Sequence, residues 1–293
     1  MDGRRATTST LRAYLALAIA IAGIAWSALF VRWAAVPGTV SAFYRVAIAG
    51  IVLAAWRGMR GGTRPISRRA AWVAVAGGVF FALDLALWNT AVLKTQAAVA
   101  SILGNNTPIF VGIMSWLVLR QRPRRSFWIG LALSLAGCLL IISTNLQRDA
   151  ASGSLTGDLL ALVASVFFAA YLIVTERVRQ SMDTLTMNAL AIAGSVGTLL
   201  AIALVLRLPL TGFTPQTWVA LAGLGLVSQL MAYYALVYAL GHLPATITSV
   251  GLLAQVPCTA ALAWLLLGEP LTPLQIAGGG VVLAGIYVVN REA

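Results

Sequence analysis

The sequence predicts an all-α integral membrane protein with ten transmembrane helices, arranged as two inverted-topology five-helix repeats with cytoplasmic N- and C-termini. Three observations predict this fold: the composition, the spacing of the apolar runs, and a weak similarity between the two halves. Of the 293 residues, 60% are hydrophobic and 10% are charged, whereas soluble domains have about 45–50% apolar and about 25% charged residues. The composition therefore excludes a soluble globular protein.

The apolar runs are long enough to be membrane spans, because a helix needs about 20 residues to cross a hydrocarbon core of about 30 Å. We expect ten spans, at 11–31, 38–56, 70–92, 97–118, 126–144, 157–176, 184–206, 216–239, 245–267 and 273–290. The first run has no A-x-A cleavage signature leading into a soluble domain, so we expect a retained span and not a signal peptide. Cys138 and Cys258 each lie inside an apolar run, where reduced, buried thiols are expected.

The distribution of basic residues predicts the orientation. With a cytoplasmic N-terminus, fifteen Arg side chains lie in cytoplasmic segments and four Arg or Lys side chains in periplasmic ones. This is the asymmetry that the positive-inside rule describes. It also explains the net charge of +12, from 20 Lys and Arg against 8 Asp and Glu, so we expect no nucleic-acid partner.

The two halves resemble each other when they are compared at a shift of 148 residues. Matching positions are Ser101 with Ser249, Trp116 with Trp264, Gly130 with Gly278 and Gly137 with Gly285. We therefore expect a first five-helix repeat at 1–146 and a second at 147–293. Five is an odd number, so the second repeat enters the membrane from the opposite side. Inverted repeats are typical of secondary transporters, where alternating access rocks one repeat against the other.

Two proline breaks are expected near the bilayer midplane, at Pro108 in the fourth span and Pro257 in the ninth. A proline inside a helix leaves a backbone carbonyl one turn earlier without its partner. The amides beside these breaks, Asn105, Asn106 and Gln255, can satisfy such a carbonyl or bind a substrate. The alternative is that they only cross-link helices through hydrogen bonds.

Two ionisable residues lie about 10–12 Å inside the membrane, Arg45 in the second span and Asp84 in the third. A lone charge at this depth is costly, so we expect these two side chains to interact. Arg45 then has a structural or coupling role. Asp84 is either the other half of a structural ion pair or a group that binds a substrate ammonium or a proton.

Deep aromatic side chains complete the candidate site. Trp26 and Tyr171 occupy equivalent positions in the two repeats, and Gln229 and Tyr233 share one helix face at i and i+4. Aromatic rings at the midplane suit a flat or apolar ligand. The candidate substrate-binding residues are Trp26, Asp84, Trp88, Asn105, Asn106, Tyr171, Gln229, Tyr233 and Gln255.

Other chemistry finds little support. His242 is the only histidine and lies in a turn, so we expect no histidine-based metal site or catalytic triad. The sequence carries no nucleotide-binding motif, so we expect no cofactor, and any active transport must be secondary.

The chain resembles the EamA-type exporters of the drug/metabolite transporter superfamily. The resemblance rests on Phe43-Tyr44-Arg45, the small-residue fourth span with Pro108, and the segment 264–272, Trp-Leu-Leu-Leu-Gly-Glu-Pro-Leu-Thr. In the first half, Arg120-Gln121-Arg122-Pro123 replaces the Gly-Glu of this turn, so we expect Glu269 to be structural. The resemblance implies a bacterial inner-membrane protein whose central cavity is lined by helices one, three, four, six, eight and nine.

These observations predict a secondary transporter, and not an enzyme, that exports small metabolites by alternating access. Within the family, the length and the ten spans are similar to those of amino acid exporters, which favours aromatic and other neutral amino acids as substrates. A nucleotide-sugar or sugar-phosphate carrier of the same superfamily is the alternative, and a membrane-embedded enzyme or a channel are alternatives of other classes. The expected partners are a small-molecule substrate and the lipid bilayer, and the expected state is a monomer, with a homodimer as the alternative.

Overall fold

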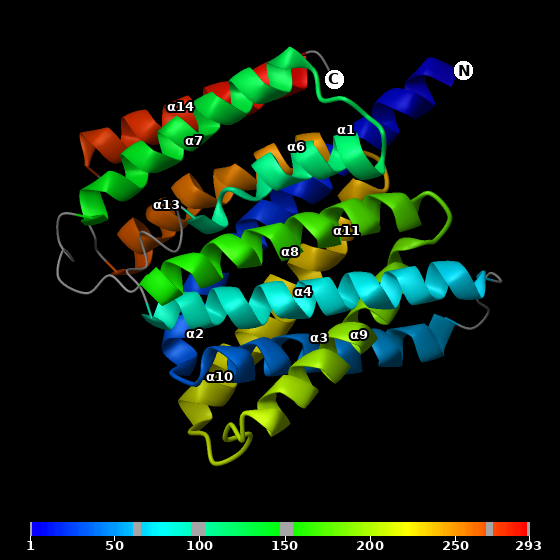
Figure 1. Cartoon of the computed structure of the whole chain (residues 1–293), viewed down its shortest axis with the longest axis vertical. Helices are drawn as coiled ribbons and strands as arrows, with labels where there is room; N and C mark the ends of the chain where they lie inside the picture. The colour runs from blue at the N-terminus through cyan, green and yellow to red at the C-terminus, as the bar shows by residue number, and fades with distance from the viewer. Residues whose placement is uncertain (1, 61–65, 95–102, 147–154, 268–271, 292–293) are drawn as a thin grey trace.

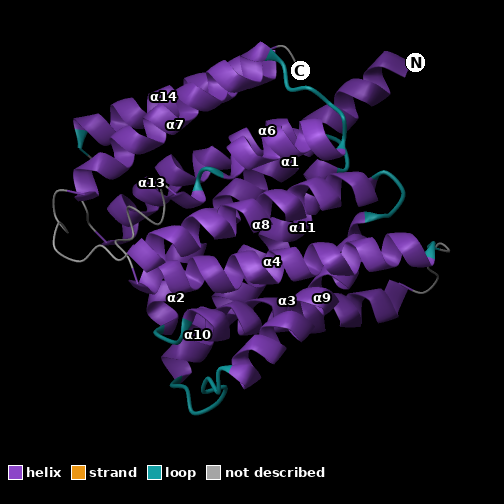
Figure 2. Ribbon diagram, in the orientation of Figure 1, coloured by secondary structure: helices purple, strands orange, loops and turns teal. Residues whose placement is uncertain are grey.

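The computed structural model describes residues 2–60, 66–94, 103–146, 155–267 and 272–291 (Figure 1). The described residues form helices and connecting turns without strands (Figure 2). In the first half the helices are α1 (Asp2–Ala25), α2 (Ser27–Ala34), α3 (Gly38–Arg60), α4 (Arg68–Lys94), α6 (Thr107–Val118) and α7 (Arg125–Leu146). In the second half they are α8 (Leu155–Arg179), α9 (Thr184–Val205), α10 (Pro215–Gly223), η1 (Leu224–Met231), α11 (Ala232–Leu240), α12 (Ala245–Gly251), η2 (Leu252–Ala254), α13 (Gln255–Leu267) and α14 (Pro273–Arg291).

The predicted all-α membrane fold is confirmed. Nine helical segments of the described residues are long and apolar enough to cross a membrane. The tenth expected span, 97–118, is represented by the shorter apolar helix α6, because 95–102 lie outside the described residues. The N- and C-termini lie at the same end of the helices (Figure 1), as an even number of crossings requires.

Helix starts follow ordinary capping chemistry at the ends of the membrane. The side chain of Asp183 accepts a hydrogen bond from the Thr186 N–H at the start of α9, and Thr214 accepts one from the Thr217 N–H at the start of α10. Each bond satisfies one of the backbone donors that a helix N-terminus leaves free.

A pseudo-two-fold axis relates α7 to α14, the last helices of the two repeats. A Cβ added to Gly130 would lie 2.5 Å from the Gly285 carbonyl oxygen, and a Cβ added to Gly137 would lie 2.6 Å from the Gly278 carbonyl oxygen. Gly130 matches Gly278 and Gly137 matches Gly285 in the repeat. Replacing each glycine by its equivalent therefore converts the first contact into the second. This is the contact pattern of an inverted repeat.

The axis passes close to Ser134, whose hydroxyl donates a hydrogen bond of 3.3 Å to the Val282 carbonyl oxygen. These positions are themselves 148 residues apart, so they are one another's equivalents. The missing side chains at the four glycines let the two backbones approach closely, as small residues do between membrane helices. The division of the chain at 146 and 147 stays a prediction.

Four spans are interrupted among the described residues, two more than the sequence predicts. The turn at Asn105 and Asn106 precedes α6, and the tight 3₁₀ segment η2 precedes α13, so both proline regions are irregular as expected. In addition, the first span breaks between α1 and α2 at Trp26, and the eighth contains the π-helix η1. Polar side chains of the site described below lie in or directly beside each of these four segments.

Candidate functional site

Arg45 is the centre of a buried hydrogen-bond network between α3, α2 and η1. Its Nε donates to Gln229 Oε1 at 2.8 Å, its Nη1 donates to Ser27 Oγ at 2.9 Å, and its Nη2 donates to the Ser228 carbonyl oxygen at 3.3 Å. The side chain is 3% exposed. Hydrogen bonds therefore replace the water that this guanidinium would otherwise require.

The π-helix η1 supplies two of the acceptors of Arg45. Each backbone hydrogen bond of a π-helix spans one more residue than in an α-helix, and such segments occur frequently at functional sites. The Ser228 hydroxyl donates to the Gly23 carbonyl oxygen of α1 at 2.9 Å, so the segment is fixed from two sides. A Cβ added to Gly225 would lie 2.6 Å from Ile48 Cβ, which shows how closely η1 approaches α3.

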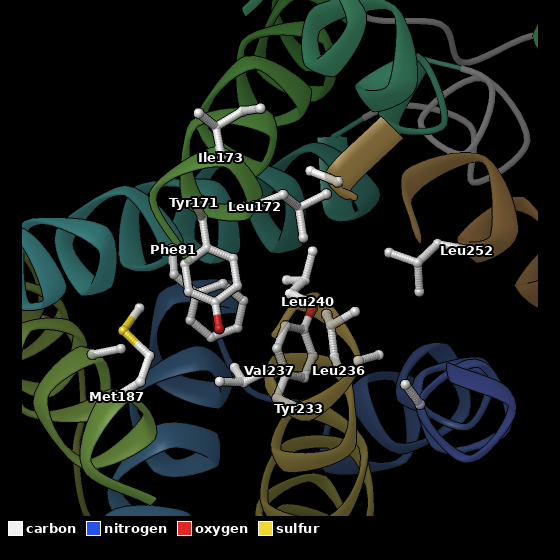
Figure 3. Close-up of a cluster of buried hydrophobic side chains, with 14 of the residues drawn as sticks. Phe81, Tyr171, Leu172, Ile173, Met187, Tyr233, Leu236, Val237, Leu240 and Leu252 are labelled. Carbon is white, nitrogen blue, oxygen red and sulfur yellow. The ribbon is translucent and has the colours of Figure 1, made fainter. Parts of the chain in front are cut away.

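Aromatic rings adjoin this network. The Arg45 guanidinium carbon lies 5.1 Å from the centre of the Tyr233 ring, within the range of a cation–π contact. Tyr233 lies 4.6 Å from Phe81, and Phe81 lies 4.8 Å from Tyr171, between ring centres (Figure 3). Phe168 lies 6.1 Å from Tyr171. We call Phe81, Phe168, Tyr171 and Tyr233 the aromatic cluster.

Asp84 lies on α4, one turn after Phe81 of the aromatic cluster, and is 9% exposed. Asp84 and Arg45 interact electrostatically, as the sequence predicts. The interaction is not a direct ion pair, because the hydrogen bonds of Arg45 go to Ser27, Gln229 and the Ser228 carbonyl. No described residue donates a hydrogen bond to the Asp84 carboxylate.

One face of α4 connects the aromatic cluster with the break in the fourth span. Phe81, Asp84 and Trp88 stand at i, i+3 and i+7 and so share this face. A Cβ added to Gly104 would lie 3.1 Å from Trp88 Nε1, so the indole lies directly against the interrupted backbone. The face of α4 that carries Asp84 therefore reaches the break in the fourth span through Trp88.

The structure brings the two proline breaks together. Gln255 Nε2 donates to Asn105 Oδ1 at 3.3 Å, which joins the start of α13 to the turn before α6. The Asn106 Nδ2 also donates a hydrogen bond to the Leu103 carbonyl oxygen, at 3.3 Å. Pro108 lies in the first turn of α6, and Pro257 lies 3.5 Å from the position of a Cβ on Gly279. The cross-link between helices is thus present, and a role of these amides in substrate binding stays a prediction.

Trp26 lies apart from the aromatic cluster. It stacks on Phe30 of its own span at 5.7 Å between ring centres, whereas its repeat equivalent, Tyr171, stacks on Phe81. The described ring contacts do not pair these two equivalents with each other. Glu269 lies outside the described residues. Cys138 and Cys258 are both free thiols, as predicted, but only Cys138 is buried, whereas Cys258 is half-buried.

Sequence reasoning missed Ser27, Ser228 and Phe81. Serine and phenylalanine are common inside membrane helices, so their identity alone gives no signal. Ser228 directly precedes Gln229, and two adjacent polar residues in an aliphatic helix could have indicated a non-α segment. The contact of Phe81 depends on which face of α4 meets α8, and the apolar residues that surround Phe81 in the sequence do not specify this face.

Comparison with known proteins gives a consistent result. The model of the EamA-like transporter family matches residues 11–143 and again 155–291. The uncharacterised transporter YwfM of Bacillus subtilis is 30% identical over 70% of this chain and 68% of its own. The pseudopaline exporter CntI of Pseudomonas aeruginosa is 28% identical over 88% of both chains.

A probable terminal-alkyne amino-acid exporter of Streptantibioticus cattleyicolor is 25% identical over 85% of this chain and 82% of its own. A solved crystal structure matches with a TM-score of 0.77 over 98% of both chains at 19% identity. At this level of identity, the structural match supports the fold alone.

Proposed function

Because the chain belongs to the EamA-like transporter family, we propose that it exports neutral and aromatic amino acids, or metabolites with the same zwitterionic group, by alternating access. It is a multi-pass inner-membrane transporter of a small molecule, and relatives include exporters. The substrate class, the outward direction and the absence of any chemical reaction on the substrate are the proposed parts.

The unpartnered carboxylate of Asp84 is the observation that carries the proposal. A buried acidic side chain in a membrane is costly unless it is paired, and the nearby cation already donates to three other acceptors. The ammonium group of an amino acid supplies the donors and the positive charge that Asp84 lacks. The substrate would then complete an interaction that the described residues leave incomplete.

The surroundings of Asp84 fit the rest of an amino acid. The aromatic cluster begins one turn away at Phe81, and aromatic rings suit an apolar or aromatic side chain. Arg45 already donates hydrogen bonds to three acceptors, so this side chain does not bind a large anion. Its positive charge still favours a substrate carboxylate on the side away from Asp84. A zwitterion therefore suits the site better than a cation or an anion alone.

Hydrogen bonds within the second half of the chain join α8 to α11 and α12 at the predicted cytoplasmic end. The Glu176 carboxylate of α8 accepts from the Ala245 N–H at the start of α12, at 3.0 Å. Three residues later, Arg179 Nε donates to the Val237 carbonyl oxygen of α11 at 3.1 Å. We propose that these bonds break when this end opens, while the broken backbone at η2 absorbs the change in direction.

Counterflow in proteoliposomes tests the proposal. Vesicles preloaded with unlabelled phenylalanine or threonine should take up the radiolabelled amino acid in the wild type and at least tenfold more slowly in Asp84→Asn, which keeps the shape but loses the charge. Asp158→Asn makes the same chemical change in the first turn of α8. It is the matched control and should exchange normally. Exchange of none of the common amino acids by the wild type would contradict the proposed substrate class.

The site gives less support to a sugar-phosphate carrier of the same superfamily. A phosphate needs several free cationic donors, and Arg45, the cation placed deep among the described spans, is already occupied by Ser27, Gln229 and the Ser228 carbonyl. Preloading with a sugar phosphate in the same assay should therefore produce no counterflow.

A further inference from the structure

A groove outside the site lies between α3 and α9, helices that run next to each other at the side of the protein away from α7 and α14 (Figure 1). Its volume is about 650 Å³, and its lining is apolar except at one end. Small side chains form much of its floor, at Ala47, Gly50 and Ala54 of α3 and at Ala189, Ala193 and Gly197 of α9. Ile51, on its edge, is 71% exposed, so the groove faces lipid.

The length of the groove matches one leaflet of a bilayer. Along α3 it extends from Ala47 to Arg57, which is about 15 Å at 1.5 Å per residue. Half of a hydrocarbon core of about 30 Å is the same distance. The groove therefore covers the depth of the acyl chains in a single leaflet.

Arg57 closes the groove at the predicted cytoplasmic end. Its Nη1 donates to Thr186 Oγ1 at the start of α9, at 3.1 Å, and this bond holds the guanidinium across the end of the groove. This is the hydrogen bond that the structure shows between Arg57 and the described residues, so most of its five N–H donors are available to an acceptor outside the protein. A guanidinium fork matches the oxygens of a phosphate group.

Gly197 is a glycine that the packing of the protein does not require. A Cβ added there would meet no atom within 4 Å, although glycine in a helix costs about 1 kcal/mol relative to alanine. By contrast, a Cβ on Gly50 would lie 2.9 Å from Ile192 Cγ2 of α9. The space at Gly197 therefore belongs to the groove and is open to an occupant from outside the protein.

We propose that this groove binds one acyl chain of an anionic phospholipid of the cytoplasmic leaflet and that Arg57 binds the phosphate of the same lipid. Charge decides between this occupant and a helix of a second copy. In a two-fold dimer across this groove, the two Arg57 side chains would meet on the same side of the membrane, next to the other basic residues of the cytoplasmic segments. An anionic lipid instead neutralises this charge, as expected for basic residues at the cytoplasmic surface.

Native mass spectrometry of the detergent-solubilised full chain, titrated with phosphatidylglycerol or phosphatidylcholine, tests the proposal. The wild type should bind phosphatidylglycerol about fivefold more tightly, which corresponds to one basic residue near the surface. Arg57→Gln should lose this preference. Gly197→Leu fills the groove and should weaken the binding of both lipids.

Two matched variants provide the controls. Arg291→Gln removes an exposed cytoplasmic arginine at the end of α14, and Gly280→Leu adds a side chain at a second glycine with open space around it. Both should bind lipid like the wild type. An unchanged lipid preference in Arg57→Gln overturns the proposal, whether or not Gly197→Leu folds. Loss of a dimer in Gly197→Leu with unchanged lipid binding would instead identify the groove as a contact between two copies and would also overturn it.

Discussion

The contact between Arg45 and Gln229 can be measured by a double-mutant cycle. Arg45→Met removes the donor of the 2.8 Å hydrogen bond from Nε to Gln229 Oε1 and leaves a buried amide oxygen without its partner. Gln229→Leu removes the acceptor and leaves a buried, charged N–H without its partner. An unpaired buried polar group costs about 1–3 kcal/mol, and more when it is charged.

The structure predicts how the two effects combine. Once Gln229 is gone the Arg45 Nε–H is already unpaired, and once Arg45 is gone the Gln229 amide oxygen is already unpaired. The double variant should therefore be destabilised by less than the sum of the single variants. Hydrogen bonds between membrane helices couple by about 0.6 kcal/mol on average and about 1.7 kcal/mol at most. A charged donor that is 3% exposed belongs at the upper end, so we expect a coupling of about 1–1.7 kcal/mol.

Equilibrium unfolding in mixed micelles, followed by tryptophan fluorescence, gives the free energies of unfolding. The control cycle combines Arg45→Met with Asp183→Ala, since these residues share no contact, and it should be additive within about 0.5 kcal/mol. If the Arg45 and Gln229 variants are equally additive, the hydrogen bond contributes nothing specific. The network between α3 and η1 would then have been assigned incorrectly.

Three further predictions concern the scaffold and the broken spans. Gly137→Ala should lower the free energy of unfolding by about 1–3 kcal/mol, because its Cβ would lie 2.6 Å from the Gly278 carbonyl oxygen; Gly280→Ala, with open space around it, should not. Asp183→Ala should cost about 0.5–2 kcal/mol at pH 7 through loss of the α9 cap. Burial raises the pKa of Asp183, but hydrogen bonds from Thr186 outweigh it and lower the pKa overall, so this stabilisation is present above about pH 4 and should disappear in thermal unfolding as the pH falls through the lowered pKa. If the amide contacts substrate, Gln255→Leu should slow counterflow and leave the unfolding temperature nearly unchanged. A purely structural amide would give the reverse, a lower unfolding temperature with nearly unchanged counterflow.

The sequence was sufficient for the features that depend on composition and spacing. Apolar run length identifies the spans, and the positions of four glycines in the 148-residue repeat anticipate the crosswise packing of α7 on α14. The depth of Arg45 and Asp84 is also readable, because each lies at a countable distance from the end of its span. Each of these properties depends on a position along the chain. In a helix that crosses the membrane, such a position corresponds to a depth along the membrane normal.

The rotation of each helix about its axis could not be read in the same way. The hydrogen bonds of Arg45 to Ser27 and the Ser228 carbonyl depend on a break in the first span and on the π-helix η1. No proline lies at either irregularity, so the signal that marks the other two breaks is missing from the sequence here. For the same reason, depth alone favours a direct ion pair between Arg45 and Asp84. The rotation of α3 instead directs the Arg45 guanidinium toward η1.

The charged groups of the site break the symmetry that the helices keep. The helix equivalent to α3 is α9, and it contains no basic residue; the span equivalent to α4 is 216–239, and it contains no acidic residue. Arg45 and Asp84 therefore belong to the first repeat only, while the broken segments before α6 and α13 occur once in each repeat. A symmetric pair of backbone breaks can open the two sides of the membrane in turn, whereas a single charged site must serve both states. We therefore expect Asp84→Asn to slow uptake and efflux by the same factor, since the substrate meets one carboxylate from either side.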